Sequence, residues 1–299
     1  MSKQILVSVL INSYNGDKFI EKSIQSVLDQ SLQNFEIIFW DNCSKDSTQS
    51  KIKLFNDPRI KYYLSSEHTS QYEARKQAIL KCNAELIAIL DVDDWWDSKK
   101  LEKQTKLFSD KKIGFSCTNA WIVNERKNKN KKLAFKLLPN GSIINELLKK
   151  NFITMSSLMI RKESYLSLEY GFNPAYEIIG DFDLAIRLAL QNQFASLQEP
   201  LTYYRQHENN LTFVKIEKNI RELIDFYKVI KINPEINKNK YFNIFKNNII
   251  FSSALLLILE NKRFLAMKKI FLISSILHLL KLLIVLSLPK KIIRKIRSR

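Results

Sequence analysis

Short apolar segments alternate with longer amphipathic segments in the first 120 residues, and this alternation limits the fold more than any other feature of the chain. The apolar segments span residues 5–11, 35–40, 60–64 and 85–90, and segments with helical spacing span 17–30 and 70–81 and begin again after Ser44 and at Ser98. Repeated strand–helix units with nearly continuous apolar strands are typical of a mostly parallel sheet covered by helices on both faces. The sequence therefore predicts an α/β fold for this part of the chain.

Polar residues follow three of the predicted strands. Ser13 and Tyr14 come after the first strand, Asp41 after the second, and Asp91 and Asp93 after the fourth. In an open parallel sheet, ligands bind beyond the carboxyl ends of the strands. We therefore expect these side chains to converge on one edge of the sheet.

The end of the fourth strand is unusually acidic in the stretch AELIAILDVDDWWD, residues 84–97. Alternate carboxylates such as Asp91 and Asp93 can hold Mg²⁺ or Mn²⁺ with positions left open for phosphate oxygens. An EF-hand is excluded because Trp95 and Trp96 occupy positions that need oxygen ligands and glycine. We expect Asp97 to cap the following helix, and the tryptophans to pack in the core or, alternatively, to line a sugar site.

A longer series of motifs runs in a fixed order along residues 4–213. It begins with SYN, SVLDQ and DNCSKDST in the first 48 residues and continues with YEARKQAI, DVDD, SSLMIRKE, IIGDFDLAIRLAL and YYRQH. In this order and content the sequence resembles the family 2 glycosyltransferases. The resemblance implies the GT-A fold, a nucleotide-binding α/β sheet, and transfer of a sugar from a nucleotide-sugar donor.

The resemblance also implies a donor site that suits a UDP-sugar. Tyr14 would cover the uracil ring while the Asp41 carboxylate accepts its imide N–H; alternatively, Asp41 is a turn or cap residue. Arg75 would contact phosphate or the carboxylates, or else be a solvated charge on a helix. The donor-binding residues expected from the resemblance are Ser13, Tyr14, Asp41, Arg75 and Asp91.

Catalysis in such a site needs a divalent cation and a general base. The resemblance assigns Mg²⁺ or Mn²⁺ to Asp93, helped by Asp91 or Asp94, where it would neutralise charge on the departing diphosphate. Asp181 would accept the proton of the acceptor hydroxyl as that oxygen attacks the anomeric carbon, so that one displacement inverts the configuration. His207 is either a surface imidazole or a further contact to phosphate or metal.

The chain departs from the family pattern at several positions. Asn12 stands where proline is usual, Asn42 replaces a second aspartate, and no glycine precedes the helix of Arg75. Gly180 replaces the glutamate before the base, which leaves the tuning of that base open. We expect Asp183 to stabilise the first turn of its helix.

The C-terminal part differs in composition, so we predict two domains: a GT-A domain over residues 1–213 and a basic helical extension over 214–299. Residues 216–299 carry 18 Lys or Arg against 5 Asp or Glu. The 19-residue apolar run Ile270–Leu288 is long enough to span a bilayer, but its polar residues fall on one side of a helical wheel. We therefore expect one helix lying in the membrane interface, followed by the basic segment KKIIRKIRSR near an anionic leaflet.

These features predict a cytoplasmic, peripheral membrane enzyme at the inner face of the cell membrane. It would be a metal-dependent inverting glycosyltransferase acting on a saccharide or lipid-linked acceptor in bacterial surface-polysaccharide synthesis. Nucleic acid is not an expected partner because the last stretch lacks aromatic stacking residues. Two alternatives stay open: a catalytically silent nucleotide-sugar-binding module, and a basic membrane or nucleic-acid adaptor.

Overall fold

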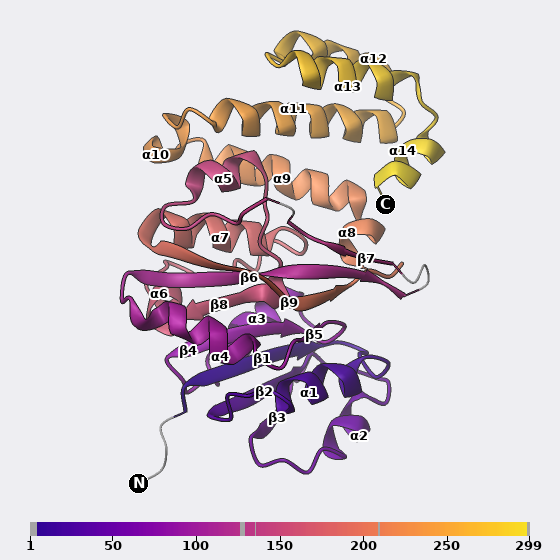
Figure 1. Cartoon of the computed structure of the whole chain (residues 1–299). Coiled ribbons are helices and arrows are strands. Elements are labelled where there is room, and N and C mark those ends of the chain that lie inside the picture. Colours follow the sequence, from indigo (N-terminus) through magenta and orange to yellow (C-terminus); the bar gives the residue numbers. More distant parts are fainter. Residues whose placement is uncertain (1–4, 126–128, 135, 209, 298–299) are drawn as a thin grey trace. The chain divides into compact units, whose positions relative to one another are not determined.

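Two compact units make up the chain, whose computed structural model describes residues 5–125, 129–134, 136–208 and 210–297 (Figure 1). The first unit comprises Met1–Ile143 and Phe152–His207. The second comprises Ile144–Asn151 and Glu208–Arg299. The second unit thus combines a short segment from the middle of the chain with the C-terminal third.

Four parallel strands form one half of the sheet in the first unit, in the order β3-β2-β1-β4. They are β1 (Val7–Ser13), β2 (Phe35–Asp41), β3 (Ile60–Leu64) and β4 (Leu86–Asp91). β1, β2 and β4 are almost wholly buried because helices cover both of their faces. The predicted α/β arrangement is confirmed, with strand limits within two residues of those expected.

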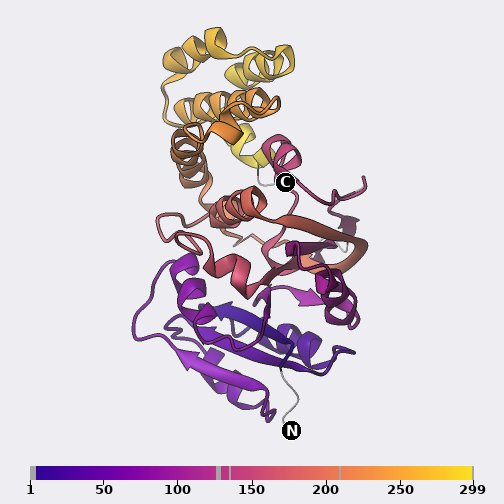
Figure 2. The same ribbon diagram turned by 90° about the vertical axis from the view of Figure 1, so that its left-hand side faces the viewer.

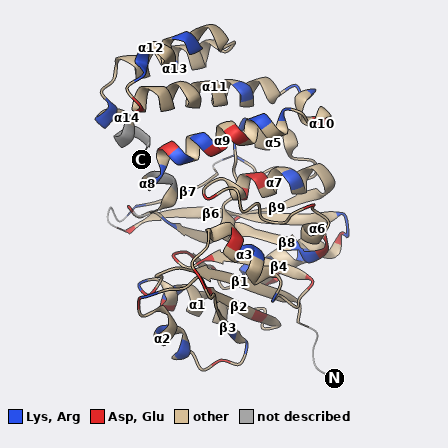
Figure 3. Ribbon diagram, turned by 180° about the vertical axis from the view of Figure 1, so that it is seen from behind, with Lys and Arg blue, Asp and Glu red and all other residues tan. Residues whose placement is uncertain are grey.

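The helices between these strands are α1 (Ile20–Leu28), α2 (Thr48–Lys53) and α3 (Gln71–Ile79), and α4 (Lys100–Thr105) follows the last of the four strands. α1 buries Ile20, Ile24 and Val27, which are spaced to lie on one helical face. Ser70 caps the start of α3: its hydroxyl oxygen accepts a hydrogen bond from the backbone N–H of Glu73. Views from opposite sides show α1 and α2 on one face of the sheet and α3 on the other (Figures 1 and 3).

Beyond β4 the sheet becomes mixed and continues in the order β8-β6-β9-β5. The strands are β5 (Trp95–Trp96), β6 (Ile113–Asn124), β8 (Leu158–Arg161) and β9 (Gln193–Arg205), and β7 (Lys129–Lys132) pairs with β6. The remaining helical segments are η1 (Lys106–Ser109), η3 (Met155–Ser157), α6 (Lys162–Leu166) and α7 (Gly180–Gln191). β5 pairs with β9 directly after the acidic stretch, so the end of β9 lies against the DVDD turn.

The second unit is helical and is built around α11 (Phe242–Leu259). α11 contacts α5 (Ile144–Lys149) and α9 (Ile216–Ile230), as well as α12 (Arg263–Met267) and α13 (Ile276–Ser287). Figures 1 and 2 show α9, α11 and the α12–α13 pair as successive layers. The shorter segments are α8 (Leu211–Val214), α10 (Pro234–Asn237), η4 (Lys268–Leu272) and α14 (Lys290–Arg297).

The prediction of one continuous helix over Ile270–Leu288 is wrong. The chain turns at residues 273–275 and separates η4 from the twelve-residue α13. The helix is interrupted because Asn247 of α11 binds Ser274 through two hydrogen bonds. The Asn247 side-chain oxygen accepts from the Ser274 backbone N–H at 3.0 Å, and the Asn247 side-chain amide donates to the Ser274 hydroxyl at 3.0 Å. These bonds replace helical ones. A helix of twelve residues is about 18 Å long and does not cross an apolar layer of about 30 Å.

Among the described residues, α11 is the one helix whose length and composition would suit a membrane span. However, 56% of its apolar window is buried inside the structure. Its buried residues include Ala254, Leu255 and Ile258, which pack with Ile220 of α9 and Leu282 of α13. α11 therefore has the surroundings of a core helix.

Candidate active site

The ends of β1, β2 and β4 meet at one edge of the sheet. The strand register pairs Ser13 with Asp41 and Asn12 with Asp91. This arrangement confirms the expected convergence of polar residues at the carboxyl ends of the strands.

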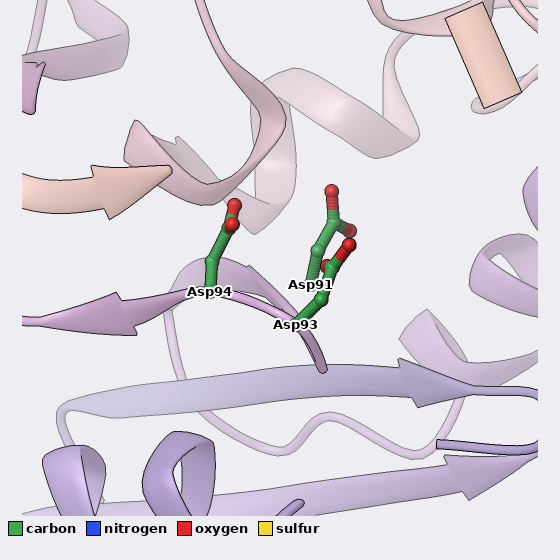
Figure 4. A group of neighbouring side chains, drawn as sticks. All are labelled: Asp91, Asp93 and Asp94. Atoms are coloured by element: carbon green, nitrogen blue, oxygen red, sulfur yellow. The ribbon is translucent and has the colours of Figure 1, made fainter. Parts of the chain in front are cut away.

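Three aspartates of the DVDD turn lie together, with one carboxylate oxygen of each within 4.8 Å of the others. The backbone N–H of Asp94 donates to the Asp91 carbonyl at 3.0 Å and closes the turn. In Figure 4 the three side chains rise from the turn on the same side, with the carboxylates of Asp91 and Asp93 next to each other. Burial raises the pKa of Asp91, although the nearby Arg75 charge opposes this effect. The structure therefore gathers three carboxyl groups at the end of β4.

Asp94 is bound to the protein through both carboxylate oxygens. One oxygen accepts from the Ser156 hydroxyl at 2.5 Å, and the other accepts from the Arg205 backbone N–H at 2.7 Å. Its side chain is buried, and burial together with the neighbouring carboxylates of Asp93 and Asp91 raises its pKa well above the usual range. Asp94 thus fastens the acidic turn to η3 and to the end of β9.

Arg75 lies inside the unit beneath Asp91. Its side chain is only 4% exposed, and its guanidinium forms an ion pair with the Asp91 carboxylate. The alternative in which Arg75 is a solvated charge on a helix is therefore wrong. Its Nε–H has no hydrogen-bond partner among the described residues, which is uncommon for a buried donor.

Asp93 faces His207, the residue two places beyond β9. Asp93 Oδ2 and His207 Nε2 are 2.9 Å apart, and each side chain is 23% exposed. The ring of Phe19 stacks on the imidazole at 5.3 Å between centroids, and Arg205 Nε donates to the Asp93 carbonyl at 2.8 Å. His207 is therefore held at the acidic turn instead of standing alone on the surface.

Asp181 occupies the first turn of α7 and is half-buried. Burial raises the pKa of its carboxyl to about 6; a hydrogen bond from the Phe182 N–H and the Arg75 charge act in the opposite direction. The charge of Asp91 also raises it. Asp183 is buried and forms an ion pair with Arg187 one turn later at 2.5 Å, in keeping with the structural role expected for it.

The residues expected to bind the nucleotide have different environments. Ser13 is buried, and its hydroxyl has no partner among the described residues. Tyr14 is 45% exposed, and its ring lies 3.8 Å from that of His68. Asp41 is fully buried and accepts hydrogen bonds from the Ser44 N–H and the Tyr62 hydroxyl, each at 2.8 Å. Asp41 therefore has at least the turn role that the sequence leaves open.

The residues around DVDD behave largely as the sequence suggests. Trp96 is 4% exposed in the core, and its indole N–H donates to the Ser156 carbonyl at 2.7 Å. Trp95 stacks on Tyr203 of β9 at 5.3 Å. The expectation that Asp97 caps α4 is wrong: Lys99 occupies the N-cap position and its side chain forms no capping hydrogen bond, while Asp97 accepts from the Lys99 N–H at 2.9 Å in the turn before the helix.

Two aromatic side chains at this edge were not anticipated. His68 lies under Tyr14, and no motif in the surrounding SSEHTS points to it. Tyr204 is half-buried near the acidic turn, where burial and the charges of Asp94 and Asp93 raise the pKa of its phenol. Tyr204 lies inside the YYRQH motif, so its sequence position offered a signal that His68 lacked.

Comparison with known proteins relates the chain to glycosyltransferases. The model described as glycosyl transferase family 2 matches residues 8–167. TuaG of Bacillus subtilis, named as a glycosyltransferase of teichuronic acid biosynthesis, is 32% identical over 235 residues, which cover 70% of this chain and 91% of TuaG. WfgD of Escherichia coli, a UDP-Glc:alpha-D-GlcNAc-diphosphoundecaprenol beta-1,3-glucosyltransferase, is 35% identical over 144 residues, covering 48% of this chain and 55% of WfgD.

Among solved structures, the mannosyltransferase PcManGT from Pyrobaculum calidifontis, in complex with GDP-Man and Mn²⁺, has a TM-score of 0.61. It is 16% identical, and the match covers 99% of this chain and 85% of PcManGT. The likeness shows a shared GT-A fold, as the motif order implied. Because the family model matches more than half of the chain and TuaG matches over most of it, the protein belongs to glycosyl transferase family 2.

Proposed function

We propose that the protein transfers a sugar from a UDP-sugar to a hydroxyl group of a saccharide or lipid-linked acceptor, with inversion at the anomeric carbon. The observation that carries this proposal is the acidic group at the carboxyl edge of the sheet. Asp91 and Asp93 lie together there, and the charges of Asp91 and Arg75 both act on the half-buried Asp181. Such a site combines a place for a cation with a carboxylate able to take up a proton.

The carboxylates fit a hard divalent ion such as Mg²⁺ or Mn²⁺. Asp93 is the best-placed ligand because it is partly exposed, and Asp91 has one oxygen outside its ion pair with Arg75. His207 could add a nitrogen ligand, since its Nε2 is already 2.9 Å from Asp93. Asp94 is a weaker candidate because both of its oxygens bind protein groups. When bound, the ion would offset the negative charge that develops on the diphosphate.

Donor binding is proposed to involve Ser13, Tyr14, Asp41, Arg75 and Asp91. Tyr14 is exposed enough for its ring to cover a uracil base. The Ser13 hydroxyl and the Arg75 Nε–H, which have no partner in the part of the chain that the structure describes, suit polar groups of the nucleotide. Asp41 would accept the uracil imide N–H through a lone pair not used by Ser44 or Tyr62. The name of WfgD, which specifies a UDP-Glc donor, supports UDP as the nucleotide.

Asp181 is proposed as the general base. Its carboxylate would take the proton from the acceptor hydroxyl while that oxygen forms a bond to the anomeric carbon. The bond from the anomeric carbon to the diphosphate oxygen breaks on the opposite side, so the configuration inverts. With a pKa near 6, Asp181 is mostly ionised at neutral pH and still basic enough to bind the proton.

We further propose that the transfer serves surface-polysaccharide synthesis at the cytoplasmic face of the membrane. The names of TuaG and WfgD support this, the latter through its diphosphoundecaprenol acceptor. Residues 1–213 would carry the transferase site, and residues 214–299 would hold the enzyme at an anionic membrane surface without binding nucleic acid. The high basic content of the second segment supports this division.

A donor screen tests the proposal. Purified full-length protein is incubated with radiolabelled UDP-sugars and one GDP-sugar, a bacterial lipid extract as acceptor, and Mn²⁺, Mg²⁺ or EDTA. We expect product from one UDP-sugar with either metal and none with EDTA. Tight UDP-sugar binding without turnover across acceptors would instead indicate a silent binding module, and turnover unaffected by EDTA would contradict the metal site.

A further inference from the structure

We propose that α12, η4 and α13 form a membrane-docking face, whose apolar side chains enter the boundary between head groups and acyl chains of an anionic bilayer. This inference deepens the peripheral membrane location proposed above by naming its surface. It does not depend on the catalytic site. We define the docking face by six exposed side chains: Phe264, Phe271, Leu272, Ile276, Leu280 and Ile284.

Exposed apolar side chains are concentrated on this face. Of the 22 large hydrophobic residues exposed in the described part of the chain, ten lie within residues 264–284. Phe271 is 89% exposed and Ile276 is 76% exposed. Scattered single residues of this kind are normal on a protein surface, but a contiguous group marks a binding surface.

α13 shows why core packing does not account for this group. Leu282 is fully buried against the α11 layer, and Val285 packs beside it, so one side of α13 belongs to the core. Ile276, Leu280 and Ile284 recur at intervals of four residues and lie exposed on the opposite side. A helix with an exposed apolar side opposite its buried side leaves that apolar side in water unless lipid or another apolar surface covers it. We therefore expect the exposed side of α13 to bind an apolar partner.

The charge around the docking face favours an anionic partner. No Asp or Glu follows Glu260, whereas eleven Lys or Arg do. Lys268 and Lys281 are exposed at the docking face. In Figure 3, α12 and α13 carry basic residues (blue) but no acidic ones, whereas α9 carries both basic and acidic residues (blue and red). Lysines of this kind can keep their aliphatic stems in the apolar layer and place their ammonium groups among lipid phosphates.

The same charges argue against a second copy of the chain as the occupant. A twofold contact would bring identical surfaces together, so Lys268 and Lys281 of each copy would face the same cations, and the surrounding segment has no acid to offset them. Nucleic acid would neutralise the lysines but would leave Ile276, Leu280 and Ile284 in contact with a polar backbone. An anionic bilayer satisfies both the apolar and the charged groups.

Vesicle flotation tests the inference. Full-length protein is mixed, without donor or acceptor, with vesicles of phosphatidylglycerol and phosphatidylethanolamine or of phosphatidylcholine alone. We expect partition into the anionic vesicles, and a decrease of about tenfold or more for Phe271→Ser combined with Ile276→Ser. The matched control is Ile232→Ser, because Ile232 is in the same unit and is also 76% exposed. It should bind like the unaltered protein.

The remaining outcomes separate the alternatives. Equal binding by the double variant and the Ile232→Ser control would overturn the docking face. Loss of a dimer in sedimentation equilibrium through Ile276→Ser, without any effect on vesicles, would identify a second copy as the occupant. Release by excess duplex DNA but not by salt-matched buffer would point to nucleic acid. Transfer to a water-soluble acceptor should be the same for all these variants, so failure of the docking face and failure of the catalytic proposal are distinguishable.

Discussion

The ring of Tyr72 occupies the space that a side chain at Gly180 would need. A Cβ atom on Gly180 would lie 2.5 Å from Tyr72 Cδ2, far closer than atoms approach in proteins. The Tyr72 hydroxyl also donates to the Ile178 carbonyl at 3.1 Å, so α3 holds the segment that leads into α7. The glutamate expected at position 180 is therefore excluded by sterics, and the neighbouring Asp181 is positioned through Tyr72.

Gly180→Ala should reduce both stability and transfer. The new methyl group must displace a buried ring, so we expect the free energy of unfolding to fall by about 1–3 kcal/mol. In a Tyr72→Ala background the same change should have a much smaller effect, because the opposing ring is absent. It should persist in a Tyr72→Phe background, where the ring remains. Urea denaturation of the variants measures this coupling, and equal effects in the Ala and Phe backgrounds would contradict the contact.

Asp181 should control the pH dependence of transfer. A base acts only when ionised, and burial has raised the pKa of this carboxyl from near 4 to about 6. We therefore expect kcat/KM to rise with pH and to reach half its plateau near pH 6. Asp181→Asn should lower transfer by about 10²-fold or more with donor binding nearly unchanged. A profile that stays flat from pH 5 to pH 8 would remove Asp181 from this role.

A matched control for Asp181 lies two residues along the same turn. Asp183→Asn weakens the ion pair with Arg187, so it should lower the free energy of unfolding and leave the pH midpoint of transfer unchanged. If Asp183→Asn instead shifts the midpoint while Asp181→Asn does not, the two residues have exchanged the roles assigned to them.

Asp93 and Asp94 should respond differently to substitution. Asp93→Ala should abolish transfer and weaken Mn²⁺-dependent UDP binding, measured by calorimetry, with little change in melting temperature because the side chain is partly exposed. Asp94→Ala should lower the melting temperature, because it leaves the Ser156 hydroxyl and the Arg205 N–H without their partner. An active Asp93→Ala enzyme would rule out Asp93 as the metal ligand.

Lys100 should make stability depend on pH. Its ammonium group is fully buried and lies 3.8 Å from the centroid of the Trp96 ring. It has no hydrogen-bond partner among the described residues, and burial lowers its pKa to about 7. Between pH 7 and about 10.5 the unfolded chain binds a proton that the folded chain does not, so the free energy of unfolding rises with pH. Below pH 7 both states are protonated and the penalty is fully present.

Lys100→Met should therefore stabilise the protein by on the order of 2–4 kcal/mol at pH 7, and by much less near pH 10. The exposed Lys99 offers the control, since Lys99→Met should change stability little at either pH. Chemical denaturation at both pH values measures the difference. A Lys100→Met protein that is less stable at pH 7 would show that the buried charge has a partner.

The sequence predicts the parallel half of the first unit well because its signals are local. Apolar runs define β1, β2 and β4, and parallel register alone brings Ser13 beside Asp41. The remainder depends on contacts between distant residues. Asn247 ends the helix expected over 270–288 by binding Ser274, and His68 reaches Tyr14 across 54 positions of sequence. No periodicity in either segment reports such a partner.

The sharing of α5 with the C-terminal helices affects how the protein is made. Ile144, Leu147 and Leu148 of α5 are buried, and α5 packs on α11, whose first residue is Phe242. A ribosome adding roughly 5–20 residues per second needs on the order of ten seconds to synthesise the stretch between them. During that time α5 has emerged without its partner helix. A chain released early would therefore expose the apolar side chains of α5 to solvent. It would become a target for chaperones and proteases even though every strand of the sheet has already been translated.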